Sequence, residues 1–194
     1  MQLKSIAIAF LATTMHAAVL AQYGSPESLK AEVNQGDDLV FAKQAVPFTE
    51  TADLSNAVFS PSLKSGDKSP ALAVLHTCGG ISQHIRMWAG AAVERGYTVL
   101  TVDAMRGLKS DCGSPSKLSN GQLVKDALDA VAHLASLPSV DNQRISVIGF
   151  SKGAMIASWL ASSSVANAVR PQTPPVAASI SAYAFCALAP NRGR

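Results

Sequence analysis

The feature that most constrains this chain is a serine between two glycines, in the motif GFSKG at residues 149–153. A β-branched apolar run, residues 145–148, precedes the motif, and a run of helix formers, residues 154–160, follows it. A chain that passes from strand to helix within so few residues must turn sharply, which crowds the positions two before and two after the serine. Gly149 and Gly153 suit those positions because they have no side chains. The pattern predicts a strained serine, Ser151, at the carboxyl end of a buried strand.

Apolar runs and amphipathic patterns alternate along most of the chain. Alternating strands and helices are typical of βαβ units, so we expect a three-layer α/β fold with a mainly parallel sheet. Functional groups in such sheets lie at the carboxyl ends of the strands, where Cys78, Asp103, Ser151 and Cys186 are predicted. The expected strands are residues 45–48, 57–59, 71–76, 98–102, 145–148 and 176–185. The expected helices are residues 85–95, 120–137 and 154–160. The second of these carries one apolar stripe and can be capped by Asn120. Residues 141–143 and 162–175 are expected to be connections, and Trp88 and Trp159 are expected in the core or at an interface.

A second motif, HTCGG at residues 76–80, follows the buried run 71–76. Gly79 and Gly80 allow the backbone to turn outward with its N–H groups free. We expect His76 to orient this loop through a hydrogen bond rather than to act as a base. The polar loop at residues 106–119 is long enough to line a site at the same edge of the sheet.

These motifs resemble the dienelactone hydrolase-like branch of the α/β-hydrolases. HTCGG is similar to the oxyanion loop H-G-C-G-G of that family, RGYTVLTVDAMRG to its next strand, and DNQRISVIGFSKGAM to its nucleophile elbow. The resemblance covers residues 46–185 and implies an α/β-hydrolase-like fold that hydrolyses carboxylic esters or lactones. It makes Ser151 the nucleophile, with the backbone N–H groups of Cys78 and Lys152 forming the oxyanion hole. The residues expected to support these two turns are Gly149, Gly153, His76, Gly79 and Gly80.

The chain departs from the family pattern in three ways. Thr77 occupies a position that is usually glycine, and Ser151 replaces the cysteine nucleophile of dienelactone hydrolase itself. The family's triad acid and histidine follow later strands, whereas no Asp, Glu or His follows Ser151 here. We therefore expect a domain that is C-terminally truncated relative to the family, lacks the last strands and is at best weakly active. Two alternatives stay open: an exported pseudo-enzyme or binding module, and a thiol-based enzyme that uses Cys78 or Cys186.

Other polar residues have more modest expected roles. His84 is expected at the rim of the HTCGG loop, where it is the candidate to replace the missing base. His133 is expected at the surface or boundary of its helix. Asp103 is expected to bond the backbone of its own turn. The Lys152 ammonium either adds positive field at an oxyanion or faces solvent.

The N-terminus indicates export from a bacterial cell. Lys4 precedes the apolar stretch 6–15, and Ala21 offers a small residue at a cleavage site, so residues 1–21 read as a signal peptide. We expect residues 22–44 to form a polar lead-in that is poorly ordered or lies on the surface, and residues 45–194 to form the catalytic domain. The mature chain is expected in the periplasm or outside the cell. Three cysteines, Cys78, Cys112 and Cys186, then permit one disulfide and one free thiol, with the pairing open.

Composition narrows the possible partners. A length of 194 residues suits a single domain, and 48% apolar residues suffice for a sizeable core. The formal charge of +3 comes without a basic run, which disfavours nucleic-acid binding. No cofactor motif, metal-ligand cluster or second membrane-length segment is visible, so we expect no cofactor, no metal, no lasting membrane span and a small-molecule partner.

Overall fold

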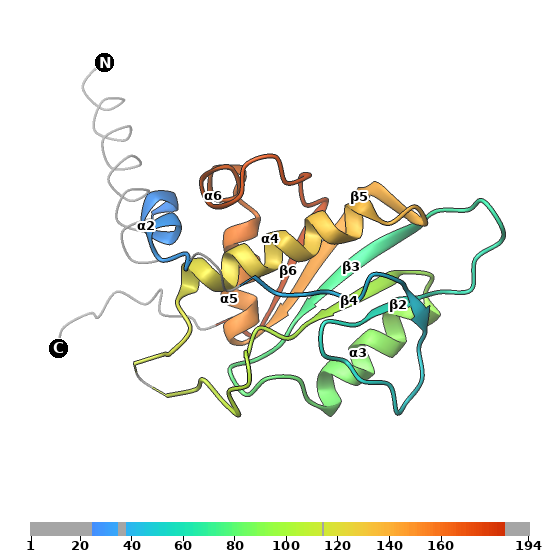
Figure 1. The fold of residues 1–194 in the computed structure, drawn as a ribbon, viewed down its shortest axis with the longest axis horizontal. Coiled ribbons are helices and arrows are strands. Elements are labelled where there is room, and N and C mark those ends of the chain that lie inside the picture. The colour runs from blue at the N-terminus through green and yellow to red at the C-terminus, as the bar shows by residue number, and fades with distance from the viewer. Residues whose placement is uncertain (1–24, 35–37, 114, 185–194) are drawn as a thin grey trace, which may run out of the picture.

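A six-stranded sheet forms the centre of the computed structural model, which describes residues 25–34, 38–113 and 115–184 (Figure 1). The predicted signal peptide and Cys186 lie outside the described residues. The strand order is β1-β2-β4-β3-β5-β6. The strands are β1 (Val46–Pro47), β2 (Val58–Ser60), β3 (Ser69–Leu75), β4 (Thr98–Val102), β5 (Val140–Phe150) and β6 (Ala178–Ala182). The helices are α2 (Pro26–Ala31), α3 (Gln83–Glu94), α4 (Asn120–Ser136), α5 (Lys152–Leu160) and α6 (Ser163–Val169).

The sheet is mainly parallel, as predicted. Strand β3 pairs in parallel with both β4 and β5, and β5 pairs in parallel with β6. Strand β2 is antiparallel to β4, and the short β1 pairs in parallel with β2. Register pairs β3 with β5 at Leu75↔Gly149, so the HTCGG loop and the GFSKG turn leave the same edge of the sheet side by side. The sheet topology therefore positions the two motifs next to each other.

Each sheet face has its own hydrophobic core, which confirms three layers. On β3, Ala71 and Ala73 point into the larger core under α4 and α5, while Leu72 and Val74 point into the smaller core under α3. Figure 1 shows α3 on one side of the sheet and α4 with α5 on the other. This arrangement explains why the β3 sequence is continuously apolar rather than alternating.

Helix α4 follows its predicted apolar stripe, but its cap differs from expectation. Val124, Leu128 and Val131 are fully buried against the sheet. The N-cap is Ser119, whose Oγ accepts from the Gln122 backbone N–H at 3.2 Å, and Asn120 is the first helical residue. Serine and asparagine are similarly good caps, so the pattern alone could not choose between Ser119 and Asn120 as the capping residue.

Two polar stretches that the sequence predicted as connections are regular structure. Residues 141–143 belong to β5, whose first part extends beyond the core with exposed side chains, so its sequence lacks the apolar signal of a strand. Helix α6 lies within the predicted connection 162–175 and buries a single residue, Val165. Both elements were missed because they bury too little apolar surface to leave a periodic pattern.

The N-terminal segment contains a docked helix that the sequence prediction did not include. Leu29 of α2 is buried beside α4, and the Asn34 backbone N–H donates to Gln122 Oε1 at 2.9 Å. The Gly121 backbone N–H donates to the Glu32 carboxylate at 3.0 Å. A Cβ added to Gly121 would lie 1.9 Å from the Leu29 carbonyl oxygen, so only glycine permits this close approach.

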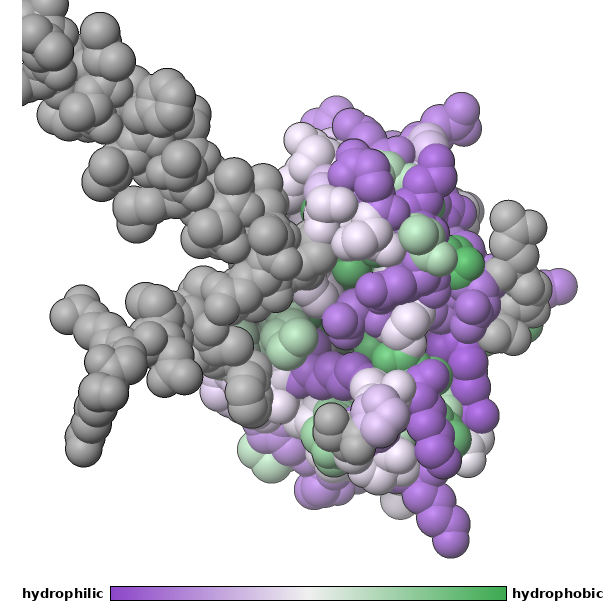
Figure 2. Space-filling model, turned by 90° about the vertical axis from the view of Figure 1, so that its left-hand side faces the viewer, coloured by the Kyte–Doolittle hydropathy of each residue, from purple (hydrophilic) through white to green (hydrophobic). Residues whose placement is uncertain are grey.

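The surface differs between the face shown in Figure 2 and the edge of the sheet at β6. The face drawn in Figure 2 is mainly hydrophilic, with hydrophobic side chains in small separate patches. Strand β6 pairs with β5 at the edge of the sheet, and its Ile180 is 48% exposed. Among the described helices, none combines the length and apolar character needed to span a membrane.

Gly121→Ala should detach α2 from α4. The new methyl group overlaps the Leu29 carbonyl, and overpacking of this kind costs about 1–3 kcal/mol, more than the helix propensity gained. Urea unfolding should show the loss, and limited proteolysis should cut near residue 30 faster. Asn120→Ala on the same turn is the control and should change neither. A Gly121→Ala protein as stable as the wild type would show that α2 does not dock here.

Candidate active site

Ser151 occupies the sharp turn that the sequence predicted between β5 and α5. Its φ of 52° and ψ of −109° lie in a region that residues with side chains rarely adopt, which confirms the predicted strain. A Cβ added to Gly149 would lie 2.0 Å from the Gly153 carbonyl oxygen, and one added to Gly153 would lie 2.6 Å from the His76 carbonyl oxygen. Both glycines are therefore required by close backbone packing, as expected.

The HTCGG loop lies directly against this turn and forms a tight turn of its own. The Gly80 backbone N–H donates to the Thr77 carbonyl at 3.1 Å, with Gly80 at a φ of +80° that favours glycine. The Gly79 N–H donates to Thr77 Oγ1 at 3.1 Å. Thr77 thus contributes a hydrogen bond to the loop that glycine, the usual residue in the family pattern, could not make.

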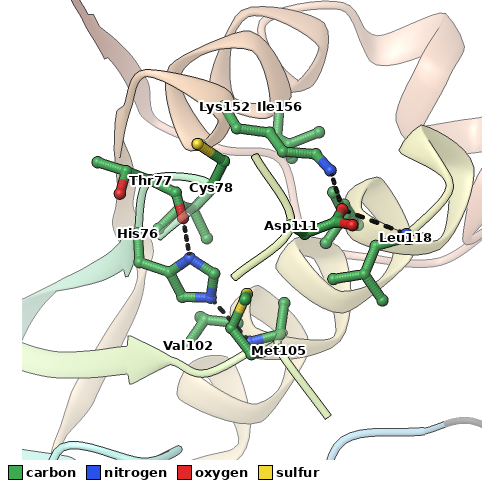
Figure 3. Close-up of a pocket in the computed structure, with 13 residues that line it drawn as sticks. His76, Thr77, Cys78, Val102, Met105, Asp111, Leu118, Lys152 and Ile156 are labelled. Atoms are coloured by element: carbon green, nitrogen blue, oxygen red, sulfur yellow. Dashed lines mark hydrogen bonds and ion pairs between the residues drawn. The ribbon is translucent and has the colours of Figure 1, made fainter. Parts of the chain in front are cut away.

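His76 orients the loop, as expected, and has no free ring nitrogen. The Ala104 backbone N–H donates to His76 Nε2 at 3.1 Å, so Nδ1 carries the proton and donates it to the Thr77 carbonyl at 2.6 Å (Figure 3). Burial lowers the pKa of His76 below its ordinary value, outweighing the opposing influence of the Thr77 carbonyl and Asp103. A neutral histidine with both nitrogens engaged is a structural element of the loop, not a base.

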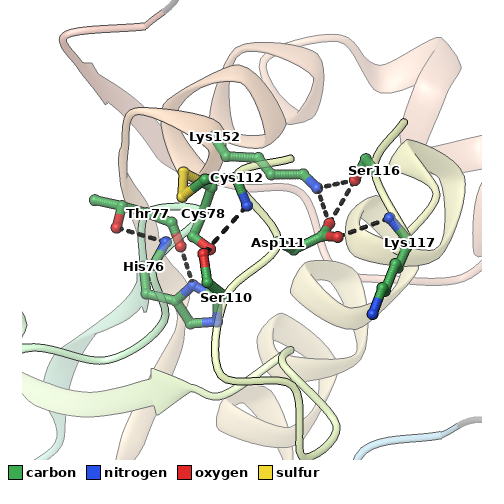
Figure 4. The surroundings of a disulfide bond; sticks show 10 residues. His76, Thr77, Cys78, Ser110, Asp111, Cys112, Ser116, Lys117 and Lys152 are labelled. Carbon is green, nitrogen blue, oxygen red and sulfur yellow. Dashed lines mark hydrogen bonds and ion pairs between the residues drawn. A yellow bond between two sulfur atoms is a disulfide. The ribbon is translucent and has the colours of Figure 1, made fainter. Parts of the chain in front are cut away.

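A disulfide joins Cys78 to Cys112 and resolves the pairing that the sequence left open (Figure 4). It ties the HTCGG loop to the polar loop after β4, across 34 residues of sequence. Because the Cys78 sulfur is in this bond, it is not available as a thiolate nucleophile while the disulfide is intact. The thiol-based alternative is therefore left with Cys186, outside the described residues.

The Lys152 side chain takes neither of the two orientations considered from the sequence. Its Nζ donates to Asp111 Oδ2 at 2.5 Å and to Ser116 Oγ at 2.5 Å, away from the serine turn (Figure 4). The ammonium is thus neither directed at an oxyanion nor free in solvent. The sequence analysis did not single out its partner Asp111, which belongs to no recognised motif. The only signal was that Asp111 lies in the long polar loop expected to line a site.

The Asp111 carboxylate is buried yet well provided with hydrogen-bond donors. Its side chain is 2% exposed. Burial by itself would raise the pKa of Asp111, but donation from Lys152, Ser116 and the backbone N–H groups of Lys117 and Leu118 more than offsets that effect and holds the pKa far below its ordinary value. The surrounding donors therefore favour the charged form of Asp111 despite its burial.

Asp103 and His133 have structural partners. Asp103 accepts from the Met105 backbone N–H at 3.2 Å, which confirms the expected bond within its own turn, and from Ser55 Oγ at 3.0 Å. His133 lies on α4 with its Nε2 2.9 Å from the Ala42 carbonyl. Among the described residues, the Ser151 hydroxyl makes no hydrogen bond to any side chain. No cluster of potential metal ligands is present in that part of the chain.

His84 lies at the rim, as predicted, within a group of aromatic rings. Its ring stacks edge-on against Phe150, with centroids 4.6 Å apart, and its Nε2 accepts from Trp88 Nε1 at 3.1 Å. Tyr183 adds a further ring at 6.3 Å from His84. Trp88 is 43% exposed, whereas the second tryptophan, Trp159, is buried in the core as the sequence suggested.

One hollow lies beside these loops and another lies on the α3 side of the sheet, and Ser151 lines neither. A small pocket of about 30 Å³ lies behind the HTCGG loop (Figure 3). Its lining includes His76, Cys78, Asp111, Lys152 and Gly153. A wider apolar groove of about 530 Å³ runs along α3, lined by Met87, Trp88, Ile148 and Ile180 among others.

The strand order and the strained serine turn place the protein in the α/β-hydrolase class of folds. The model of the dienelactone hydrolase family matches residues 56–183, more than half of the chain, so the chain belongs to this family. The match includes the whole of both motifs. No curated protein matches the chain.

Several solved structures are similar to part of the chain. A hypothetical protein from Pseudomonas aeruginosa is 28% identical, with a TM-score of 0.46, over 55% of this chain and 34% of that one. A thermophilic esterase from Thermogutta terrifontis, solved with propionate bound, is 22% identical, with a TM-score of 0.42, over 53% and 39%. A dienelactone hydrolase-like promiscuous phosphotriesterase from metagenomic libraries is 24% identical, with a TM-score of 0.41, over 56% and 46%. The chain thus spans less than half the length of each.

Gly149→Ala and Gly153→Ala should each destabilise the protein. The added methyl group must displace backbone atoms rather than a flexible side chain, and we expect a loss of about 3 kcal/mol or more, at the upper end for overpacking. Gly113→Ala is the control, because nothing lies within 4 Å of its added Cβ. Thermal melts of the three proteins check this, and an unchanged melting temperature in either elbow variant would contradict the geometry of the turn.

His76 should make stability depend on pH in mildly acidic solution. Its pKa is lowered from the ordinary 6.5, so below pH 6.5 the unfolded chain binds a proton that the folded chain does not. The stabilisation is complete above pH 6.5 and is lost as the pH falls. Urea midpoints measured between pH 7.5 and 5.0 should fall more steeply in the wild type than in His76→Gln. Equal slopes would show that His76 is not held neutral.

Proposed function

We propose that this protein hydrolyses carboxylic esters or lactones through an acyl-enzyme on Ser151. The observation that carries the proposal is the strained serine turn, which raises a hydroxyl at the carboxyl edge of the sheet in a chain of the dienelactone hydrolase family. Backbone strain at such a position is commonly retained where a side chain must be presented for chemistry. Membership of the dienelactone hydrolase family supports hydrolysis as the type of reaction.

The chemistry follows from the two adjacent turns. The Ser151 oxygen attacks the carbonyl carbon, the alcohol or enol oxygen leaves with a proton, and water then releases the acid from the acyl-enzyme. The developing oxyanion is stabilised by the backbone N–H groups of Cys78 and Lys152. Among the described residues neither group donates to a protein acceptor, so both are available to a ligand. For a lactone, the alcohol and the acid are two ends of one product.

Proton transfer is the step for which this chain is least equipped. His76 uses both ring nitrogens in structural bonds. No Asp, Glu or His follows Ser151 in the sequence. Removing triad members typically costs about 10⁴ to 10⁶ in turnover, while the oxyanion hole and substrate binding retain some rate enhancement. We therefore propose a weak hydrolase of activated esters as the activity of these 194 residues.

The same observation supports a second candidate, an exported binding module that keeps the fold without catalysis. In that case the carboxyl edge near Ser151 would bind a small ester or lactone and leave it intact. We further propose a periplasmic or secreted location. The Cys78–Cys112 disulfide supports it, because such bonds persist in oxidising compartments.

Hydrolysis of p-nitrophenyl acetate by the purified chain tests the proposal. We expect slow, saturable turnover, below about 1 per second, that disappears in Ser151→Ala. Ser164→Ala, which removes an exposed hydroxyl on α6, is the control and should keep the wild-type rate. Labelling of Ser151 by a fluorophosphonate, located by mass spectrometry, tests the nucleophile directly.

The outcomes separate the candidates. Activity that persists in Ser151→Ala rules out the proposed nucleophile. Saturable ligand binding without hydrolysis or labelling favours the binding module. Fast turnover that depends on Ser151 would mean that a base comes from within the chain, and His84→Ala is then the first variant to examine.

A further inference from the structure

We propose that Asp111 is a positioning residue that holds both N–H donors of the oxyanion hole in place. The inference rests on the proposed role of Ser151. The two donors belong to separate segments, since Cys78 follows β3 and Lys152 begins α5. The spacing between two such N–H groups must be kept to within a fraction of an ångström for both to bind one oxygen. Asp111 lies in a third segment and bonds to both residues, at the Cys78 carbonyl and at the Lys152 ammonium.

The contact with Cys78 is made by the backbone. The Asp111 N–H donates to the Cys78 carbonyl at 2.8 Å. The next residue, Cys112, holds the Cys78 side chain through the disulfide. Cys78 is therefore fixed by its carbonyl and by its sulfur to one short stretch of the polar loop. These two restraints hold Cys78, the residue that would supply the first donor, against the polar loop.

The contact with Lys152 is made by the carboxylate. Asp111 Oδ2 accepts from Lys152 Nζ at 2.5 Å, and the two side chains are 2% and 16% exposed. Figure 3 shows the long Lys152 side chain extending to Asp111, and both residues line the small pocket. Since Lys152 is the first residue of α5, holding its side chain restrains the residue that supplies the second donor.

Asp111 is itself held rigidly enough to act as this link. Its Oδ1 accepts from the Lys117 N–H at 2.7 Å, and its Oδ2 accepts from the Leu118 N–H at 3.2 Å and from the Ser116 hydroxyl. These bonds close the loop onto the start of α4. The helix, the polar loop, the HTCGG loop and the serine turn thus form one connected unit, with Asp111 at its centre.

The alternative is that Asp111 serves only to stabilise the fold. A buried ion pair often adds little net stability, because the cost of removing two charges from water offsets their attraction. A stability role therefore accounts poorly for the ion pair. A positioning role accounts for the fact that Asp111 connects two turns. The two roles differ in a measurable way: a positioning residue affects the donors locally and changes the rate at Ser151 more than the stability.

Hydrogen–deuterium exchange of Asp111→Ala and Asp111→Asn tests the positioning role without any need for turnover. We expect faster exchange in two peptides, residues 76–80 and 150–155, with the helix peptide 85–94 unchanged. Asp111→Asn keeps the side-chain shape and guards against a failure to fold. Asp129→Asn, in a separate ion-pair group with Lys125 and Arg170, is the matched control and should leave both peptides unchanged. Faster exchange in only one peptide, or in neither, overturns the proposal.

A single-turnover reaction connects the positioning to chemistry. A p-nitrophenyl phosphonate modifies a reactive serine once and releases p-nitrophenolate, and intact mass reports modification of Ser151. We expect Asp111→Asn and Lys152→Met each to slow this reaction about 10- to 100-fold, below the full loss for one oxyanion donor. The double variant should be no slower than either single one, because both break the same link. Fully additive losses, or wild-type rates in Asp111→Asn, overturn the proposal.

Failure of the proposed function gives a different pattern. If the wild type is not modified at Ser151, the nucleophile assignment fails. The exchange experiment then still decides whether Asp111 fixes the two turns.

Discussion

The close approach of backbone to backbone at Gly149 and Gly153 is the constraint on which the rest of the site depends. Strand β5 must end and α5 must begin within a single residue, and only missing side chains allow the chain to fold back so tightly. Gly153 also packs against the carbonyls of Leu75 and His76, the last residue of β3 and the first of the next loop. One steric requirement therefore creates the strained serine and also brings the HTCGG loop against it.

A second layer of restraint comes from the polar loop after β4. The disulfide holds the HTCGG loop from one side, and the Asp111–Lys152 pair holds the start of α5 from the other. The buried ion pair is weak evidence for stability, since desolvation offsets much of its attraction. Its more informative property is geometric, because it joins three segments that are distant in sequence. The polar loop thus connects the HTCGG loop to the serine turn, in addition to the pairing of β3 with β5 below them.

The two faces of the sheet are covered unequally. Helices α4, α5 and α6 bury one face, whereas α3 covers the other beside an apolar groove that includes the half-exposed Ile180 and Trp88. The described chain thus builds its deepest core on the side where α4 and α5 support the serine turn. The carboxyl edge near Ser151 is bordered on the α3 side by the rings of His84, Phe150 and Tyr183.

The sequence by itself determined the parts of the protein whose residue types are dictated by local geometry. The glycines of GFSKG and the apolar runs of β3 and β4 leave few alternatives to a parallel sheet with a strained serine at its edge. Helices α2 and α6 and the start of β5 bury too few side chains to leave such a pattern. Three further features depend on contacts between segments far apart in sequence. They are the Cys78–Cys112 disulfide, the Asp111–Lys152 ion pair and the His76 tautomer, which the Ala104 N–H fixes. Their partners are chosen by distance in space, which only the tertiary structure decided.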